Sequence, residues 1–140
     1  MSEERTMTSD EIRMPGWPAP RGFVYGRVCR GRVLHLAGLI GSDARGAVCP
    51  GGLVPQFALA LDHVIAVVRA AGGLPEDIAT MTAYVTDIAA YRSSGKELGA
   101  AWRARLGKHF PAMALVAVSA LVEPEAVVEL QATAYLGGES

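Results

Sequence analysis

The most informative part of this chain is residues 110–121, FPAMALVAVSAL, followed by residues 127–132, VVELQA. Both are apolar runs of strand length, so they predict two neighbouring strands close to the C-terminus. The second run carries Glu129 where a core residue is expected. Because an ionised carboxylate is costly to bury unless hydrogen bonds or a counter-charge replace its water, this position indicates a functional site.

The composition indicates one domain that does not bind nucleic acid. The 140 residues can bury about two-thirds of their unfolded surface without disulfides or metals. Lys and Arg number 13 against 14 Asp and Glu, and no basic cluster is interleaved with aromatic residues. This charge pattern argues against a nucleic-acid partner. Cys29 and Cys49 lack metal-ligand spacing, so we expect free thiols, no metal and no cofactor.

The N-terminal residues favour a cytoplasmic protein. Residues 1–13 are charged and lack the apolar segment of a signal peptide. We also expect no membrane association, because no apolar stretch approaches the length of a membrane span.

Apolar residues are abundant for a small domain: 51% are hydrophobic and 19% are charged, with a mean hydropathy of +0.26. Such a surplus is often buried between subunits, which predicts an oligomer. The alternative is a well-filled core in a monomer.

Periodicity predicts an irregular arm over residues 1–20 and one domain over residues 21–138. Two strands joined by a hairpin turn at Arg30-Gly31-Arg32 are expected first. Helical spacing follows over residues 54–71, ended by Gly72-Gly73 as a C-cap. The predicted elements are strands at 22–30 and 32–40, a helix at 54–71, a strand at 78–86, a helix at 91–108, and strands at 113–121 and 127–135.

This order, ββαβαββ, predicts an α+β fold with a mixed sheet and two helices on one face. Alternation in the last strand divides its residues between two faces. Val128, Leu130, Ala132 and Ala134 are expected to pack on the helices. Val127, Glu129, Gln131, Thr133 and Tyr135 form the other face, whose mixed character suits an inter-subunit surface enclosing a pocket.

Four segments together resemble the RidA/YjgF family of reactive intermediate deaminases. Residues 36–41, LAGLIG, are similar to its early SGQI strand, and residues 56–72 to its first helix. Residues 77–87 resemble its strand ending in YVTD, and residues 110–132 its C-terminal signature beginning FPA. The resemblance covers residues 22–136.

The resemblance implies a chorismate-mutase-like fold, a homotrimer, and three small-molecule sites between subunits. Family deaminases add water to an enamine or imine and release ammonia. An arginine after the Pro-Ala pair holds the substrate carboxylate, and a glutamate of the last strand handles water. Glu129 is at the glutamate position, whereas Met113 replaces the arginine. Ala37 and Leu115 replace a hydroxyl residue and a cysteine, so we expect altered specificity.

These considerations make Glu129 the candidate catalytic residue, because a carboxyl in an apolar cleft suits proton transfer near neutral pH. The alternative is an ion pair across a subunit interface with Arg30 or Arg32. His109 is a candidate proton shuttle or, alternatively, a histidine stabilised at a helix C-terminus. The candidate substrate-binding residues are Phe23, Tyr25, His35, Ala37, Gly38, His109, Met113 and Leu115.

Three functions follow from this pattern. The first is a RidA-like hydrolytic deaminase of enamine or imine intermediates with altered substrate specificity. The second is a non-catalytic small-molecule-binding or regulatory trimer, favoured by the missing arginine. The third is an endoribonuclease, an activity attributed to some members of the family, which ranks last because the sequence shows no basic surface.

Overall fold

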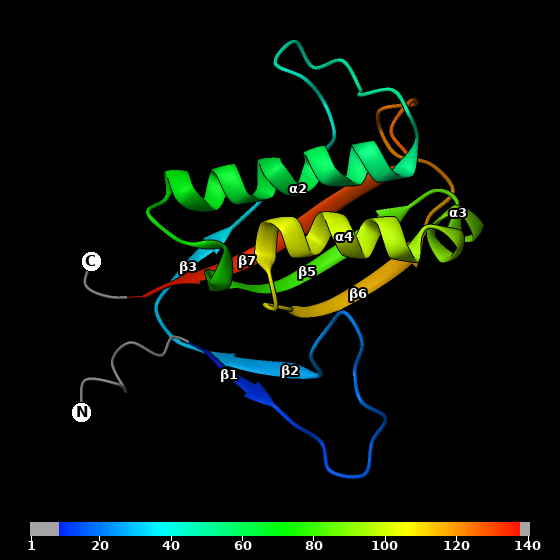
Figure 1. Ribbon diagram of the computed structural model, residues 1–140. Coiled ribbons are helices and arrows are strands. Elements are labelled where there is room, and N and C mark those ends of the chain that lie inside the picture. Colours follow the sequence, from blue (N-terminus) through cyan, green and yellow to red (C-terminus); the bar gives the residue numbers. More distant parts are fainter. Residues whose placement is uncertain (1–8, 138–140) are drawn as a thin grey trace.

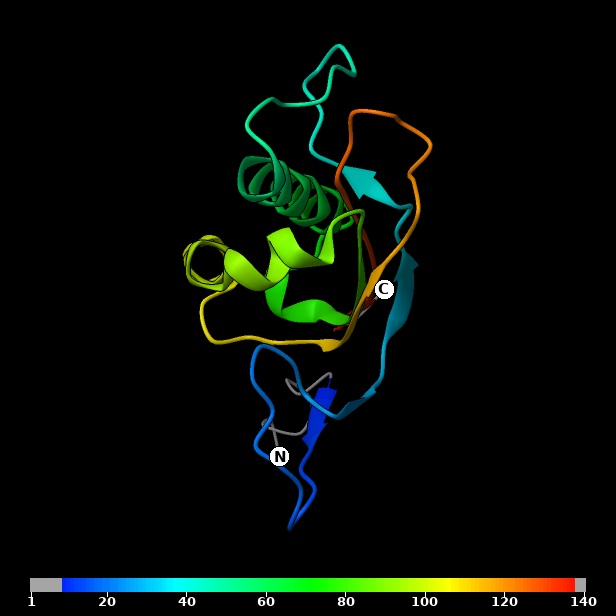
Figure 2. The ribbon, with the colours of Figure 1, turned by 90° about the vertical axis from the view of Figure 1, so that its right-hand side faces the viewer.

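Helices cover one face of a mixed sheet in the computed structural model, which describes residues 9–137 (Figure 1). Figure 2 shows α2 and α4 on the same side of the sheet. This confirms the predicted α+β fold and its ββαβαββ order, with the predicted elements at 32–40 and 91–108 each divided in two. The domain consists of β2 Gly26–Cys29, β3 Arg32–His35, β4 Leu39–Ile40, α2 Leu53–Ala70, the 3₁₀ turn η1 Pro75–Asp77, β5 Ile78–Val85, α3 Ile88–Ser93, α4 Gly95–Leu106, β6 Ala112–Ala117 and β7 Val128–Leu136.

Capping residues and apolar spacing in the sequence explain where the helices begin, end and pack. The last turn of α2 ends in a Schellman motif, because Gly72 has φ +90° and the N–H of Gly73 donates to the carbonyl of Val68 at 2.9 Å. Asp87 caps α3 by accepting a hydrogen bond from the N–H of Ala90 at 3.1 Å. Leu98, Trp102 and Leu106 are buried on α4 at the predicted four-residue spacing.

The main sheet has the order β3–β7–β5–β6, and β4 also pairs with β7. Strand β7 is antiparallel to β3, β4 and β5, whereas β6 is parallel to β5. The prediction that the two C-terminal strands are neighbours is therefore wrong, since β5 lies between them. Parallel strands need a crossover, and the helical segment between β5 and β6 provides it.

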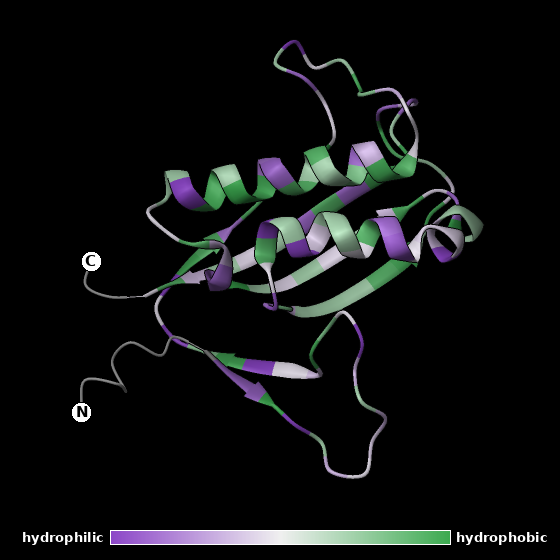
Figure 3. Ribbon diagram, in the orientation of Figure 1, coloured by the Kyte–Doolittle hydropathy of each residue, from purple (hydrophilic) through white to green (hydrophobic). Residues whose placement is uncertain are grey.

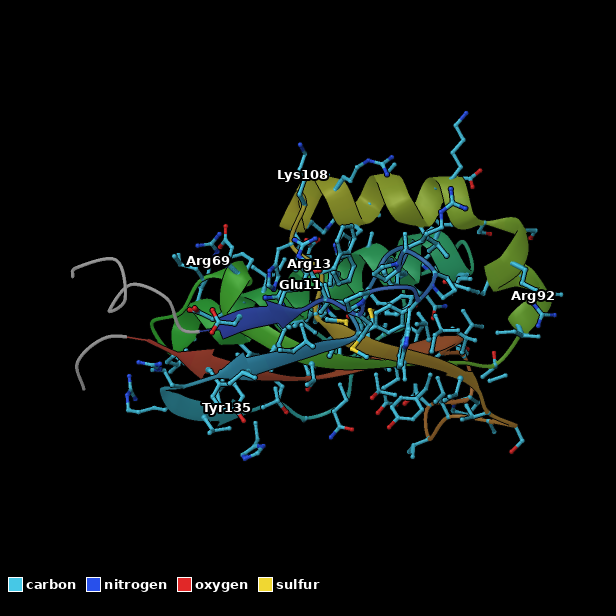
Figure 4. The ribbon with its side chains drawn as sticks, turned by 90° about the horizontal axis from the view of Figure 1, so that it is seen from below. Glu11, Arg13, Arg69, Arg92, Lys108 and Tyr135 are labelled. Atoms are coloured by element: carbon cyan, nitrogen blue, oxygen red, sulfur yellow. The ribbon has the colours of Figure 1, made fainter. Side chains whose placement is uncertain are left out.

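The two faces of the sheet separate as the alternation predicts. Val128, Leu130, Ala132 and Ala134 are buried against the helices. Gln131 is exposed on the other face, and Tyr135 points away from the helices there (Figure 4). Figure 3 shows hydrophobic residues along α2 and the strands beneath it. We call the side without helices the open face.

The N-terminal region differs from its prediction in two ways. Ser9–Ile12 forms strand β1, inside the segment predicted to be irregular, and it pairs with β2 in a separate two-stranded sheet. The expected hairpin between β2 and β3 is absent from the described sheets, because β2 pairs with β1 and β3 pairs with β7. The chain does turn at Gly31, which has φ +128°. A Cβ atom there would collide with the carbonyl of Leu136.

By length and composition, α2 is long and apolar enough to cross a membrane, which corrects the expectation that no stretch approaches a span. Its apolar face, including Leu61, Val64 and Val68, is fully buried in the core. This packing is that of the core helix of a globular domain.

Candidate functional site

Glu129 lies inside the sheet with its side chain on the open face. Its direct neighbours are Tyr84 on β5 and Ile40 on β4. Directly opposed residues of antiparallel strands place their side chains on the same face, with Cβ atoms about 5 Å apart. The side chain is half-buried, and within residues 9–137 it makes no ion pair or hydrogen bond. Arg32 pairs with Leu136, at the far end of β7 from Glu129. The alternative, an ion pair with Arg30 or Arg32 across a subunit interface, stays a prediction.

Gly38 provides the surface on which this carboxyl rests. A Cβ atom on Gly38 would collide with Oε2 of Glu129 and lie 2.9 Å from its Cδ. The pairing register explains the close approach, because four steps from His35 to Leu39 oppose three steps from Thr133 to Leu130. One extra residue therefore bulges between β3 and β4, a feature frequently found beside active sites. Only glycine leaves room for the carboxyl at position 38.

The other predicted residues of β3 and its extension lie at different distances from Glu129. Ala37 is exposed directly beside Gly38. His35 is exposed opposite Thr133. That position is four residues from Glu129 along β7, or about 13 Å at the usual strand rise. His35 shares the open face but does not reach the carboxyl.

Met113 and Leu115 lie on the helix-covered side of the sheet. In the parallel pairing of β5 with β6 they oppose Met81 and Ala83, both of which are buried in the core. The prediction of one pocket containing these residues and Glu129 is thus not met within a single protomer, because strand alternation sends them to opposite faces.

A groove of about 640 Å³ lies on that covered side, beside β6 and α4. Phe57, Tyr91, Trp102, Phe110, Met113 and Leu115 give it an apolar lining. The rings of Trp102 and Phe110 stack with centroids 5.9 Å apart. The volume of this groove is within the range of small-molecule sites.

His109 connects α4 to the start of β5. Its ring Nε2 is 2.8 Å from the carbonyl oxygen of Ile78, and its own carbonyl accepts a hydrogen bond from Trp102 Nε1 at 2.9 Å. Burial lowers the pKa of the imidazole below its ordinary value of 6.5, although the hydrogen bond to Ile78 opposes this shift. Ile78 precedes Tyr84 by six residues on β5, about 20 Å. This location favours a structural role for His109.

Phe23 and Tyr25 belong to an aromatic cluster on the segment before β2. The Tyr25 ring makes edge contacts with Trp17 and Phe23, and its hydroxyl donates to the carbonyl of Pro18 at 2.6 Å. Val24 between them is buried and bridges to Ala112 at the start of β6. The segment therefore lies beside the groove, which Gly22 also lines.

Fold and site together define an α+β protein whose mixed sheet is covered by helices on one face and carries a carboxylate on the other. The family described as Endoribonuclease L-PSP matches residues 18–136, and the chain belongs to this family, the YjgF/RidA family. The predicted resemblance is confirmed.

Solved structures of the family resemble this chain over most of its length. YyfB of Yersinia pestis, a Rid-family protein, has 29% sequence identity and a TM-score of 0.81, covering 93% of this chain and 100% of that chain. Rv2704 of Mycobacterium tuberculosis has 29% identity and a TM-score of 0.62, covering 82% and 87%. RidA from an Antarctic Psychrobacter has 26% identity and a TM-score of 0.65, covering 91% and 99%. No curated protein matches the chain.

Sequence reasoning missed two neighbours of Glu129, Tyr84 and Ile40. Both lie beside it only because β4 and β5 flank β7. Alternation assigns each residue to a face, but it does not give the strand order that makes them adjacent.

Proposed function

We propose that this protein is a hydrolytic deaminase of enamine or imine intermediates, with Glu129 as its acid/base residue. The observation that carries the proposal is the Glu129 carboxyl, which rests against Gly38 on the open face without a counter-charge in the protomer. A structural glutamate in a sheet is expected to be paired, because an unpaired, partly desolvated carboxylate is destabilising.

The chemistry requires one residue that both accepts and returns a proton. The enamine takes a proton from solvent at its carbon to give the iminium form, and Glu129 accepts a proton from water as the water oxygen bonds to the iminium carbon. In the resulting neutral carbinolamine the protonated carboxyl donates to the nitrogen, and the C–N bond breaks as the hydroxyl oxygen forms the carbonyl double bond. The hydroxyl proton returns to the Glu129 carboxylate and from there to solvent, so the products are a carbonyl compound and ammonia. The reaction consumes one water and needs no cofactor.

The complete site in this proposal forms between copies of the chain. Glu129 and the groove lie on opposite sides of the sheet, so a site that uses both requires the open face of one protomer to meet the groove of the next. A cyclic trimer provides such contacts, because its interfaces join two different surfaces, repeated around a closed ring. Val33 and Val116 on the open face are 45% and 42% exposed, which also favours burial by another subunit.

Specificity in this proposal departs from small imino acids, because Met113 cannot bind a carboxylate. The test is ammonia release in a coupled assay, with 2-aminoacrylate generated in situ compared with larger or uncharged enamines. We expect turnover of the larger enamines and little turnover of 2-aminoacrylate.

Glu129→Gln should reduce turnover by at least about a hundredfold, whereas Glu123→Gln, at an exposed position, should not. Met113→Arg should shift preference toward 2-aminoacrylate. No ammonia from any substrate at high enzyme concentration would refute the proposal.

A non-catalytic binding trimer is the second candidate, favoured by the apolar residues at positions 37, 113 and 115. Thermal stabilisation by groove ligands without turnover would support it. Ribonuclease activity, named in the family description, ranks third because net charge is −1. Salt-sensitive RNA binding and cleavage would support that activity instead.

A further inference from the structure

We infer that the groove beside α4 takes an anion with an aromatic or bulky apolar body, and that Arg21 and Arg103 bind its negative charge in place of residue 113. This inference rests on the proposed function, because it names the substrate class of the same site. It starts from the groove lining, in which these two arginines accompany the apolar residues.

Both arginines have free hydrogen-bonding capacity. Within residues 9–137 neither makes an ion pair or a side-chain hydrogen bond, and both are exposed. Arg105, which is also on α4, is by contrast paired with Asp62, and its Nε lies 2.6 Å from Oδ1 of that residue. An unpaired guanidinium at the wall of an apolar groove is suited to a carboxylate, which it binds with two parallel hydrogen bonds.

Gly99 and Arg103 lie together on the α4 wall of the groove. A Cβ atom on Gly99 would lie 3.2 Å from Nη1 of Arg103, so the guanidinium lies over this glycine. A Cβ atom on Gly95, one turn earlier, would meet nothing within 4 Å. A side chain at position 99 would therefore require the end of the Arg103 side chain to move slightly.

The body of the ligand follows from the rest of the lining. The stacked Trp102 and Phe110 rings, with Phe57 and Tyr91, offer aromatic surface that a three-carbon acid cannot fill. The groove of about 640 Å³ also exceeds what such a small acid needs. An acid with a ring or branched chain uses both the aromatic surface and the arginines.

Binding can be measured through Trp102, because the chain has two tryptophans and Trp17→Phe leaves only the one in the groove. The probes are 3-phenylpropionate, its uncharged analogue 3-phenylpropanol, and propionate. We expect 3-phenylpropionate to bind at least about tenfold more tightly than either of the others. Equal affinity for the acid and the alcohol, or no binding of the acid, would overturn the inference.

Substitution then assigns the charge to its residues. Arg21→Gln and Arg103→Gln should each weaken 3-phenylpropionate binding by about tenfold and leave 3-phenylpropanol unchanged. Arg92→Gln, an exposed arginine of α3 outside the groove lining, is the matched control. Acid binding that is unchanged in both groove variants would contradict the assignment.

The same measurements separate this inference from the proposed function. Glu129→Gln should retain the preference for the acid, because the preference depends on the arginines. Ammonia release without selective acid binding would refute only the groove inference. Selective acid binding without ammonia release from any enamine would refute only the deaminase.

Discussion

The covered face and the open face of β7 are built by alternate residues of one strand, yet they differ in burial and chemistry. On the covered face Val128, Leu130 and Ala134 have no exposed surface. On the open face Glu129 is half-buried and Gln131 is exposed. Because successive side chains point to opposite faces, stability and chemistry can be assigned to adjacent residues. Positions 129 and 130 should therefore respond to substitution independently.

The largest effect on stability is expected on the covered face. Leu130→Ala should lower the free energy of unfolding by about 2–5 kcal/mol, because it leaves a cavity among fully buried neighbours. Glu129→Gln, one residue away, should not lower it, because the substitution removes an unpaired and half-buried charge. Urea denaturation of both variants measures the difference. Similar destabilisation by the two substitutions would show that the faces are not independent.

A smaller loss of stability is expected at Gln56, which connects α2 to the start of β7. This side chain is 4% exposed. It donates to the carbonyls of Cys49 and Glu125 at 3.2 Å and accepts from the N–H of Val127 at 2.9 Å. Gln56→Leu leaves these groups unsatisfied and should cost about 1–3 kcal/mol.

The matched control for this buried glutamine is Gln131→Leu on the open face, where the side chain is exposed. It should change stability by less than about 0.5 kcal/mol. Thermal and urea unfolding of both variants provide the measurement. An equal loss at the two positions would contradict the contrast between buried and open glutamines.

Gly38→Ala tests the open face without touching the core. The added methyl group displaces the Glu129 carboxyl, so turnover should fall by about ten- to hundredfold while the unfolding midpoint changes little. Gly26→Ala is the control, because its methyl group would make an ordinary 3.7 Å contact with Ile12. Full activity in Gly38→Ala would show that the carboxyl position is not important for turnover.

The smallest expected effect is a pH dependence of stability that comes from His109, which packs against the start of β5. The pKa of His109 is lowered in the folded protein, so below pH 6.5 the unfolded chain binds the proton more readily than the folded one. The free energy of unfolding should fall as pH decreases from 6.5 toward the folded-state pKa. Above pH 6.5 the contribution of His109 to stability is fully present. Thermal unfolding from pH 5 to 8 should show a shallower dependence in His109→Gln than in the wild type. Identical pH profiles of stability for the two proteins would contradict the contribution of His109.

Local patterns predicted most of the fold but only part of the site. The faces of β7, the buried positions 98, 102 and 106 of α4, and the end of α2 at Gly72 follow from backbone periodicity and capping. Strand β1 and its pairing with β2 could not be predicted in the same way. Its four residues, SDEI, have no strand pattern of their own, and their partners on β2 lie between 14 residues (Ile12 with Gly26) and 20 residues (Ser9 with Cys29) further along the chain.

The position of Glu129 within an apolar strand, on the side facing away from the helices, can be predicted from residues 127–135 alone, because alternation is a property of the extended backbone. The motifs of residues 22–136 also indicate the family. Only the tertiary structure placed β5 between β6 and β7, brought Gly38 against the carboxyl, and separated Met113 from Glu129. These arrangements depend on hydrogen bonds between distant segments, and such bonds leave no periodic signal within any one segment.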